Sequence, residues 1–500
     1  MVGVSQRRPS SEWLISLSAG LIITVLSLTL MLSYTSPELS WDEAAYAANT
    51  ATHWGVLWGS ANYTRHFHGP MAIYLAKLGQ ERLPAGIGSP ECRLRFFAAL
   101  IGSVAVGFLF WAFRYFFGTS WEASLVGTSL LLFSVIRIKE TNIIGPHHLM
   151  LACVLGIVTL GYYWRQRPTL QAAVGLGVMM AWGALSMTYV IPAALCWAVA
   201  VALAGAGWIT WDRTHLKISW KIAVILITAA IIVTALWFPG VRQLFLDLRA
   251  LLNYGHHPTL VRDRIFESTP RWAAAYWLAY LEAPLVSFSL PIIIAALWMG
   301  LRKGRLWSKH AYIAICLVFF SGTALTAYLA GARNLLPVIG VLCVAIGALF
   351  DEALDYAPRL VRLGLSAGAV ALAALNFIWL SHNPRYIPYL ATDGYRAFVR
   401  AEGERLNERC KALVSGLPVL SFYAHQHGSR IAWDVSEVPW TTQSIPLPPD
   451  VKYVLMPEFV YKYMPPQQPM RGIIAERWKT VWSFKKDGTW ELRLYARPEQ

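Results

Sequence analysis

The sequence predicts a polytopic α-helical membrane protein that ends in a small α/β domain. Of its 500 residues, 56% are hydrophobic and only 14% are charged, whereas an average soluble domain carries about 25% charged residues. Apolar runs of about 17–25 residues, long enough to cross a bilayer, recur up to residue 381 with short gaps that contain Arg or Lys. From about residue 383 the polarity rises, and the pattern becomes that of a soluble domain.

The apolar runs predict about eleven transmembrane helices. They cover residues 13–34, 93–117, 121–137, 147–164, 170–187, 188–210, 219–239, 276–300, 311–331, 334–350 and 361–381. The first run is too long for the apolar part of a signal peptide, and no small-residue cleavage site follows it, so we expect a membrane anchor.

Basic residues predict the orientation of the chain. If Arg7 and Arg8 hold the N-terminus inside, every short inner gap carries a base, as the positive-inside rule requires. The sequence thus predicts a multi-pass protein of the cytoplasmic (inner) membrane, with a cytoplasmic N-terminus and an extracytoplasmic C-terminal domain. The net charge of +15 then mainly sets topology, and no nucleic-acid partner is expected.

Two domains follow from this division. Residues 1–382 form the membrane domain, whose long outer loops 35–92 and 240–275 are expected to form the active site, and residues 383–500 form the outer α/β domain. In the outer domain we expect a helix near 394–413, strands at 417–423 and 451–456, and a hairpin of 478–486 and 489–496 turning at Asp487-Gly488.

The first outer loop carries the most informative residues, Asp42 and Glu43. Acids are rare at the membrane edge because removing their charge from water is costly, so an adjacent pair indicates a binding or catalytic site. A structural reading also accounts for both. Ser40 and Glu43 form a capping box, and Asp42 in the first turn faces the positive end of the helix dipole. The two readings are compatible, because a capped helix start is a rigid mount for a carboxylate that acts as general base or metal ligand.

The same loop contains His66 and His68 just before Gly69-Pro70. Gly allows close approach of a ligand, and Pro suits the first turn of the following amphipathic helix, Met71 to Leu83, which we expect at the membrane interface. Contacts from the two imidazoles to a sugar or phosphate are the main prediction. No cofactor is required, although a divalent metal ion stays an alternative; zinc would need further ligands, and none has zinc-site spacing.

Cationic residues in later outer segments are candidates for binding phosphate. Arg333 lies between two spans, where it either snorkels to the headgroups or holds a phosphate with its planar fork. In the 240–275 loop, His256, Arg262 and Arg264 form either a basic binding cluster or a solvated loop. Glu140, with the pair His147-His148, allows the same two readings before the fourth span.

Two of the six cysteines, Cys92 and Cys410, fall in segments predicted to be outside. A disulfide is chemically allowed there. No other feature pairs these two residues, so the prediction is two free thiols.

Four segments resemble the C-type glycosyltransferase superfamily, in particular its protein-mannosyltransferase and aminoarabinose-transferase group. Residues 41–46, Trp-Asp-Glu-Ala-Ala-Tyr, are similar to the acidic pair of the group's first outer loop, and residues 68–74 to its motif before an interfacial helix. Residues 93–102 resemble the start of the group's second span, and residues 333–337 its late Arg-x-Leu-Leu-Pro segment. The likeness covers roughly residues 35–350 and is specific in order and placement.

The sequence departs from this group at two positions. Gly69 stands where the aminoarabinose enzymes have Lys, so contacts assigned to that Lys do not transfer. His147-His148 replaces an Asp that is common before the fourth span, which puts a second carboxylate role in doubt.

The resemblance implies an enzyme that moves a sugar from a polyprenyl-phosphate carrier to an acceptor at the outer membrane face, with inversion. Asp42 and Glu43 would be catalytic. Substrate binding would fall to Tyr46, His66, His68, His256, Arg262, Arg264 and Arg333. The partners would be the lipid-linked sugar, the bilayer and a glycolipid (such as lipid A of lipopolysaccharide), glycan or protein acceptor. A transporter or flippase of lipid-linked sugars and a non-catalytic envelope assembly protein remain alternatives.

Overall fold

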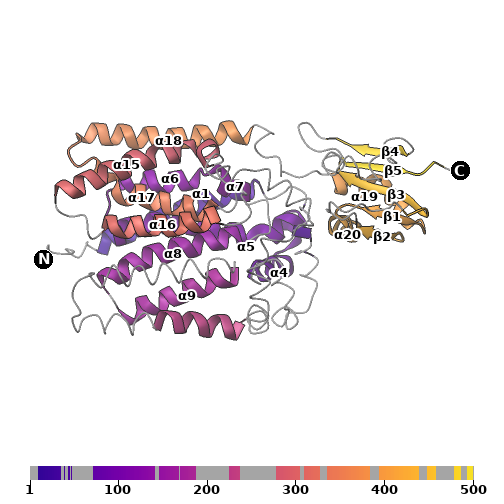
Figure 1. The fold of residues 1–500 in the computed structure, drawn as a ribbon, viewed down its shortest axis with the longest axis horizontal. Coiled ribbons are helices and arrows are strands. Elements are labelled where there is room, and N and C mark those ends of the chain that lie inside the picture. The colour runs from indigo at the N-terminus through magenta and orange to yellow at the C-terminus, as the bar shows by residue number, and fades with distance from the viewer. Residues whose placement is uncertain are drawn as a thin grey trace.

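The chain folds as a helical bundle with a mixed β-sheet domain beyond one end (Figure 1). This computed structural model describes residues 10–34, 39, 43–44, 47, 71–140, 146–167, 169–186, 224–236, 278–303, 309–326, 335–382, 394–437, 448–457, 478–485 and 492–498.

Most of the described helices fall on the predicted apolar runs. They are α1 (Ser10–Leu32), α4 (Met71–Arg82), α5 (Pro90–Ala112), α6 (Trp121–Leu132), α7 (Val135–Lys139), α8 (His147–Gln166), α9 (Leu170–Ser186), α15 (Ala283–Arg302), α16 (Lys309–Thr326), α17 (Leu336–Ala353) and α18 (Arg359–Ser381). Within the described part, six are long and apolar enough to cross a membrane: α1, α5 with its extension to Phe117, α8, α15, α17 and α18. The predicted span 188–210 lies outside the described residues, so the count of eleven stays a prediction.

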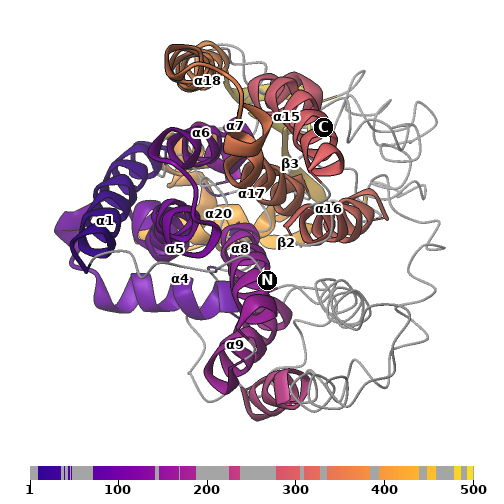
Figure 2. The same ribbon diagram turned by 90° about the vertical axis from the view of Figure 1, so that its left-hand side faces the viewer.

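Helix α17 forms the centre of the bundle. It packs against α6, α8, α15 and α16, which surround it in the view down the bundle (Figure 2). Nearly all of its side chains from Leu336 to Phe350 are buried. By contrast, α1, α15 and α18 expose large apolar side chains such as Leu21, Leu290 and Leu375, as expected of helices that face lipid.

The predicted single span over 121–137 is wrong, because the structure divides it into α6 and α7. With 12 residues, α6 is only about 18 Å long at about 1.5 Å per residue. The Ser134 hydroxyl caps α7 by accepting a bond from the Arg137 amide at 3.2 Å. The fully buried Arg137 guanidinium donates to the carbonyls of Leu131 and Leu132 at 2.9 and 2.7 Å. The end of α6 is therefore satisfied by a side chain from the next helix.

Helix α4 lies across the bundle axis, lengthwise in a view that shows α5 and α8 end-on (Figure 2); its position at the membrane interface stays a prediction. It contacts α5 and α9. Its close approach to α5 depends on Gly79, since a Cβ there would come within 2.0 Å of the Arg93 carbonyl oxygen. The added Cβ would meet a backbone carbonyl, which cannot rotate away as a flexible side chain can.

Gly79→Ala should therefore push α4 away from α5 and destabilise the protein by about 1–3 kcal/mol, the usual cost of overpacking. The measurement is the thermal unfolding midpoint of the purified protein in detergent. Gly86→Ala, seven residues on, is the matched control, because a Cβ at Gly86 meets nothing within 4 Å. Equal midpoints for the two variants would contradict the proposed contact.

The C-terminal domain contains a five-stranded sheet in the order β2-β1-β3-β5-β4. Its strands are β1 (Lys411–Val414), β2 (Asp434–Glu437), β3 (Val451–Pro457), β4 (Lys479–Phe484) and β5 (Leu492–Ala496). Strand β1 pairs in parallel with β2 and β3, whereas β5 pairs antiparallel with β3 and β4. The predicted strand at 451–456 and the terminal hairpin are confirmed; the expected turn at Asp487-Gly488 lies outside the described residues.

Two sequence predictions in this domain are wrong. The segment predicted as a strand at 417–423 belongs to the helix α20 (Leu417–Gln426). Gly416 precedes it in the left-handed conformation, with φ 87°, and Pro418 occupies its first turn, where proline favours a helix start. The helix expected at 394–413 ends early: α19 spans Gly394–Glu402, and β1 begins at Lys411.

Candidate functional site

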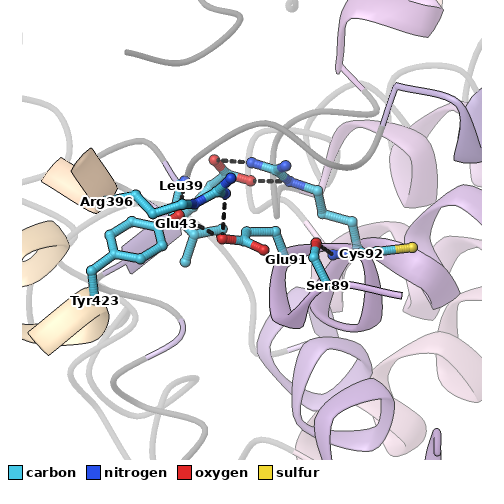
Figure 3. Close-up of polar contacts among 8 residues, drawn as sticks. Leu39, Glu43, Ser89, Glu91, Cys92, Arg396 and Tyr423 are labelled. Carbon is cyan, nitrogen blue, oxygen red and sulfur yellow. Dashed lines mark hydrogen bonds and ion pairs between the residues drawn. The ribbon is translucent and has the colours of Figure 1, made fainter. Parts of the chain in front are cut away.

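The end of the bundle nearest the C-terminal domain brings together the start of α5, Leu39, Glu43 and the helices α19 and α20 (Figure 3). Of the predicted site residues, Glu43 is described, and it lies here. The others lie outside the described residues: Asp42, Tyr46, His66, His68, His256, Arg262, Arg264 and Arg333. Ser40 is also outside, so the capping box stays a prediction.

Glu43 forms a buried ion pair with Arg95 of α5. Both carboxylate oxygens accept hydrogen bonds from the guanidinium, one from Nε and one from Nη2, each at 2.8 Å. Both residues are 1% exposed. This two-point contact uses the match between the planar fork of arginine and a carboxylate, and it fixes the side chain of Glu43. Glu43 thus has a clear structural role, while its catalytic role stays a prediction.

Glu91, one helical turn before Arg95, joins α5 to the C-terminal domain. Its Oε1 accepts a bond from Arg396 of α19 at 2.6 Å and one from the Tyr423 hydroxyl of α20 at 2.8 Å. Figure 3 shows Arg396 and Tyr423 reaching Glu91 from the same side. The Arg396 guanidinium also stacks 5.4 Å from the centre of the Tyr423 ring. Ser89 caps α5 at the Cys92 amide, at 3.3 Å, which fixes the turn that carries Glu91.

The Arg396 guanidinium stays protonated in this contact. Burial by itself lowers the pKa of this guanidinium, but the Glu91 carboxylate and Tyr423 together raise the pKa above its ordinary value. The guanidinium is therefore cationic over the ordinary pH range, and it pairs with the Glu91 carboxylate across the contact between the bundle and the C-terminal domain.

Tyr423 makes one further contact, with the chain segment that carries the acidic pair. Its hydroxyl oxygen accepts a hydrogen bond from the backbone amide of Leu39 at 3.0 Å. The hydroxyl is therefore acceptor for Leu39 and donor to Glu91 at the same time. Tyr423 is 2% exposed and Leu39 is 3% exposed, so water has little access to either bond.

A second buried polar cluster surrounds α7. Oε1 of Glu282 accepts bonds from the Ser134 hydroxyl and the Ile136 amide, both at 2.8 Å, which ties the start of α15 to α7. At the other end of α7, Glu140 lies 3.3 Å from Nδ1 of His147. Two of the three residues that allowed two readings in the sequence, Glu140 and His147, thus form a buried carboxylate–imidazole pair at the start of α8.

The two clusters are linked through α5. A Cβ at Gly102 would lie 2.7 Å from Nδ1 of His148, so the absence of a side chain there allows the imidazole to pack against α5. Gly102 follows Arg95 by seven residues, two helical turns on the same face and about 10 Å along the axis. The Glu43–Arg95 pair and His148 therefore line the same side of α5.

Comparisons with known proteins agree with this architecture. No family model matches the chain, and no curated protein matches it in sequence. Among solved structures, apo ArnT from Cupriavidus metallidurans matches with a TM-score of 0.55 at 14% identity, over 97% of this chain and 98% of that chain. The oligosaccharyltransferase AglB from Archaeoglobus fulgidus matches with a TM-score of 0.50 at 12% identity, over 96% of this chain and 74% of its own.

The arabinofuranosyltransferase AftD from Mycobacteria matches over 95% of this chain and 41% of its own, with a TM-score of 0.50 at 15% identity. In ArnT the likeness runs through both the bundle and the outer domain, since it covers almost the whole of each chain. The chain has the C-type glycosyltransferase fold.

The described residues contain no group of three or more His, Cys, Asp or Glu side chains that could hold a metal ion. The loop with His66 and His68 lies outside the described residues, so a divalent ion there stays an alternative. Cys92 and Cys410 are both free cysteines in the structure.

Sequence reasoning missed three residues at this end of the C-type glycosyltransferase fold: Glu91, Arg396 and Tyr423. Glu91 had a detectable signal, because an acid in the first turn of an apolar helix is costly to bury without a partner. Its partner Arg396 is 305 positions away in the sequence, and no local pattern indicates that contact. In the sequence, Arg95 stands out only as part of the family-like segment 93–102, whereas the structure gives it a defined partner, Glu43.

Proposed function

We propose that this protein is an integral-membrane glycosyltransferase that moves a sugar from a polyprenyl-phosphate carrier to an acceptor at the outer face of the cytoplasmic membrane. The observation that carries the proposal is the match to ArnT over 97% of this chain and 98% of that one. The matching AglB structure contains a dolichol-phosphate, a lipid phosphate of the kind proposed here. The N-terminus would be cytoplasmic and the sheet domain extracytoplasmic.

The chemistry needs a base and a cationic site for the leaving phosphate. Asp42 would take the proton from an acceptor hydroxyl while the hydroxyl oxygen attacks the anomeric carbon. The bond from that carbon to the phosphate oxygen breaks, and the lipid phosphate leaves with the electron pair. Arg333, with Arg262 or Arg264, would stabilise the developing negative charge. A single displacement of this kind inverts the anomeric centre.

The distribution of charge supports an enzyme at the membrane edge over a transporter. A transporter is expected to carry acids near the middle of the bilayer and on broken helices. In the described spans the acids lie at helix ends, for example Glu91 at the start of α5, Glu282 just before α15 and Glu352 at the end of α17. This arrangement suits a reaction at the surface, with the sugar held at the headgroup level.

Arg333→Ala tests the phosphate site. We expect it to weaken binding of polyprenyl phosphate by about tenfold or more, because a hydrogen bond to a charged group contributes about 1.5–3 kcal/mol. The measurement is titration of polyprenyl phosphate into the full-length protein in nanodiscs. Arg430→Ala is the control, since it removes the same charge from an exposed position in the C-terminal domain. Equal affinities of the two variants would count against a phosphate clamp at Arg333.

Transfer itself is tested with the purified protein, a panel of polyprenyl-phosphate hexoses and pentoses, and envelope lipids as acceptors. Acceptor-dependent release of polyprenyl phosphate supports an enzyme. Movement of an intact lipid-linked sugar between leaflets without release would instead support the flippase.

A further inference from the structure

Among the described residues, the Tyr423 hydroxyl links the C-terminal domain to the segment that carries Leu39 and Glu43. Oη of Tyr423 accepts the Leu39 amide at 3.0 Å and donates to Glu91 at 2.8 Å. Arg396 from the neighbouring helix α19 completes the contact by pairing with the same Glu91 oxygen at 2.6 Å. Two helices of the C-terminal domain thus converge on one carboxylate at the start of α5.

The same turn of α5 holds the loop at a second point. Arg95 follows Glu91 by four residues, which places both side chains on one face of the helix, and Arg95 binds Glu43 through two hydrogen bonds of 2.8 Å. Leu39 and Glu43 are therefore both held, one by the outer domain and one by α5. Asp42 lies between these two positions in the sequence, next to the second.

Both contacts, Leu39 with Tyr423 and Glu43 with Arg95, are buried. Leu39, Glu43, Glu91, Arg95 and Tyr423 are each at most 3% exposed. A backbone amide buried to this degree needs a hydrogen-bond partner, and losing the partner leaves the full desolvation cost. Water cannot simply replace the Tyr423 hydroxyl without the local packing opening.

We propose that Tyr423 and Arg396 are positioning residues that hold Leu39, and through Glu91 the turn of α5 that binds Glu43, in place for the reaction. This inference rests on the proposed function, in which Asp42 is the base. The outer domain is then a working part of the active site, although neither residue touches substrate. Its effect passes through the hydroxyl of Tyr423 to the Leu39 backbone and through Glu91 to α5.

The test compares Tyr423→Phe with wild type by hydrogen–deuterium exchange on the full-length protein in nanodiscs. Loss of the hydroxyl should speed exchange in peptides covering residues 39–47 by about tenfold, as expected when a buried amide loses its partner. Tyr453→Phe is the matched control. It removes another buried tyrosine hydroxyl from the same domain, one that donates to Glu408 at 3.0 Å, and should leave this exchange unchanged.

Turnover is then measured on the same samples. Positioning predicts that Tyr423→Phe lowers kcat about tenfold with little change in the KM for the lipid-linked sugar, and that Arg396→Lys, which keeps the charge, retains more activity than Arg396→Gln. Unchanged exchange at 39–47, or faster exchange with normal kcat, would overturn the proposal. If wild type itself transfers no sugar, the proposed function fails, while the exchange result still decides whether the outer domain holds the loop.

Discussion

Asp42→Asn should abolish sugar transfer while the protein is still made and folded. The amide has the shape of the carboxylate but cannot accept the acceptor's proton, and a positioned general base typically contributes about 10²- to 10⁴-fold to the rate. The measurement is release of polyprenyl phosphate from the lipid-linked sugar by purified protein in nanodiscs. Binding of polyprenyl phosphate should stay close to that of wild type, since the base acts on the acceptor.

The control for this experiment is Asp434→Asn, the same chemical change at an exposed position of the C-terminal domain. It should retain full turnover. If Asp42→Asn turns over as fast as Asp434→Asn, residue 42 is not the base, and the acceptor must be activated elsewhere. The carboxylate–imidazole pair of Glu140 and His147, 3.3 Å apart, would then be the next group to replace.

Arg95→Ala should cause the largest loss of stability among the variants considered. It leaves the Glu43 carboxylate buried without the cation that faces it, and breaking a buried ion pair from one side typically costs about 3–5 kcal/mol. We expect a lower yield of folded protein and a clearly lower thermal unfolding midpoint. Arg82→Ala, at an exposed end of α4, should change the free energy of unfolding by no more than about 0.5 kcal/mol.

A double variant separates structure from chemistry at Glu43. Arg95→Met with Glu43→Met removes both charges, and replacing a buried ion pair by hydrophobic residues of similar volume is often nearly neutral. Most of the lost stability should therefore return. If the double variant is stable and fully active, Glu43 is not catalytic. If it is stable and inactive, Glu43 acts in the reaction or holds Asp42 in place.

Much of the bundle could be predicted because hydropathy is a local property. The predicted spans 147–164 and 361–381 differ from α8 and α18 by two residues or fewer at each end. The break between α6 and α7 was missed because it depends on the guanidinium of Arg137 turning back to two carbonyls. An arginine inside an apolar run gives no sign in sequence of whether it faces protein or lipid.

Local sequence patterns were also insufficient to predict parts of the C-terminal domain and of the site. In α20 the start signal, Gly416 followed by Pro418, was present in the sequence, but the apolar content of the next residues outweighed it. Glu43 was identified as important from its place beside a span, whereas its partner Arg95 is 52 positions away. The Leu39–Tyr423 bond joins residues 384 positions apart. Contacts of this kind depend on how the domain docks and leave no local pattern.

The docking of α19 and α20 on the first turn of α5 also limits how this architecture can be recombined. A chimera that joined this bundle to the outer module of another enzyme would bury Glu91 without a counterion and would leave the Leu39 amide unsatisfied. Grafting would succeed only if an aromatic hydroxyl and a guanidinium were transplanted with the module, at the positions now held by Tyr423 and Arg396. The two parts would therefore have to be inherited, or engineered, as a matched set.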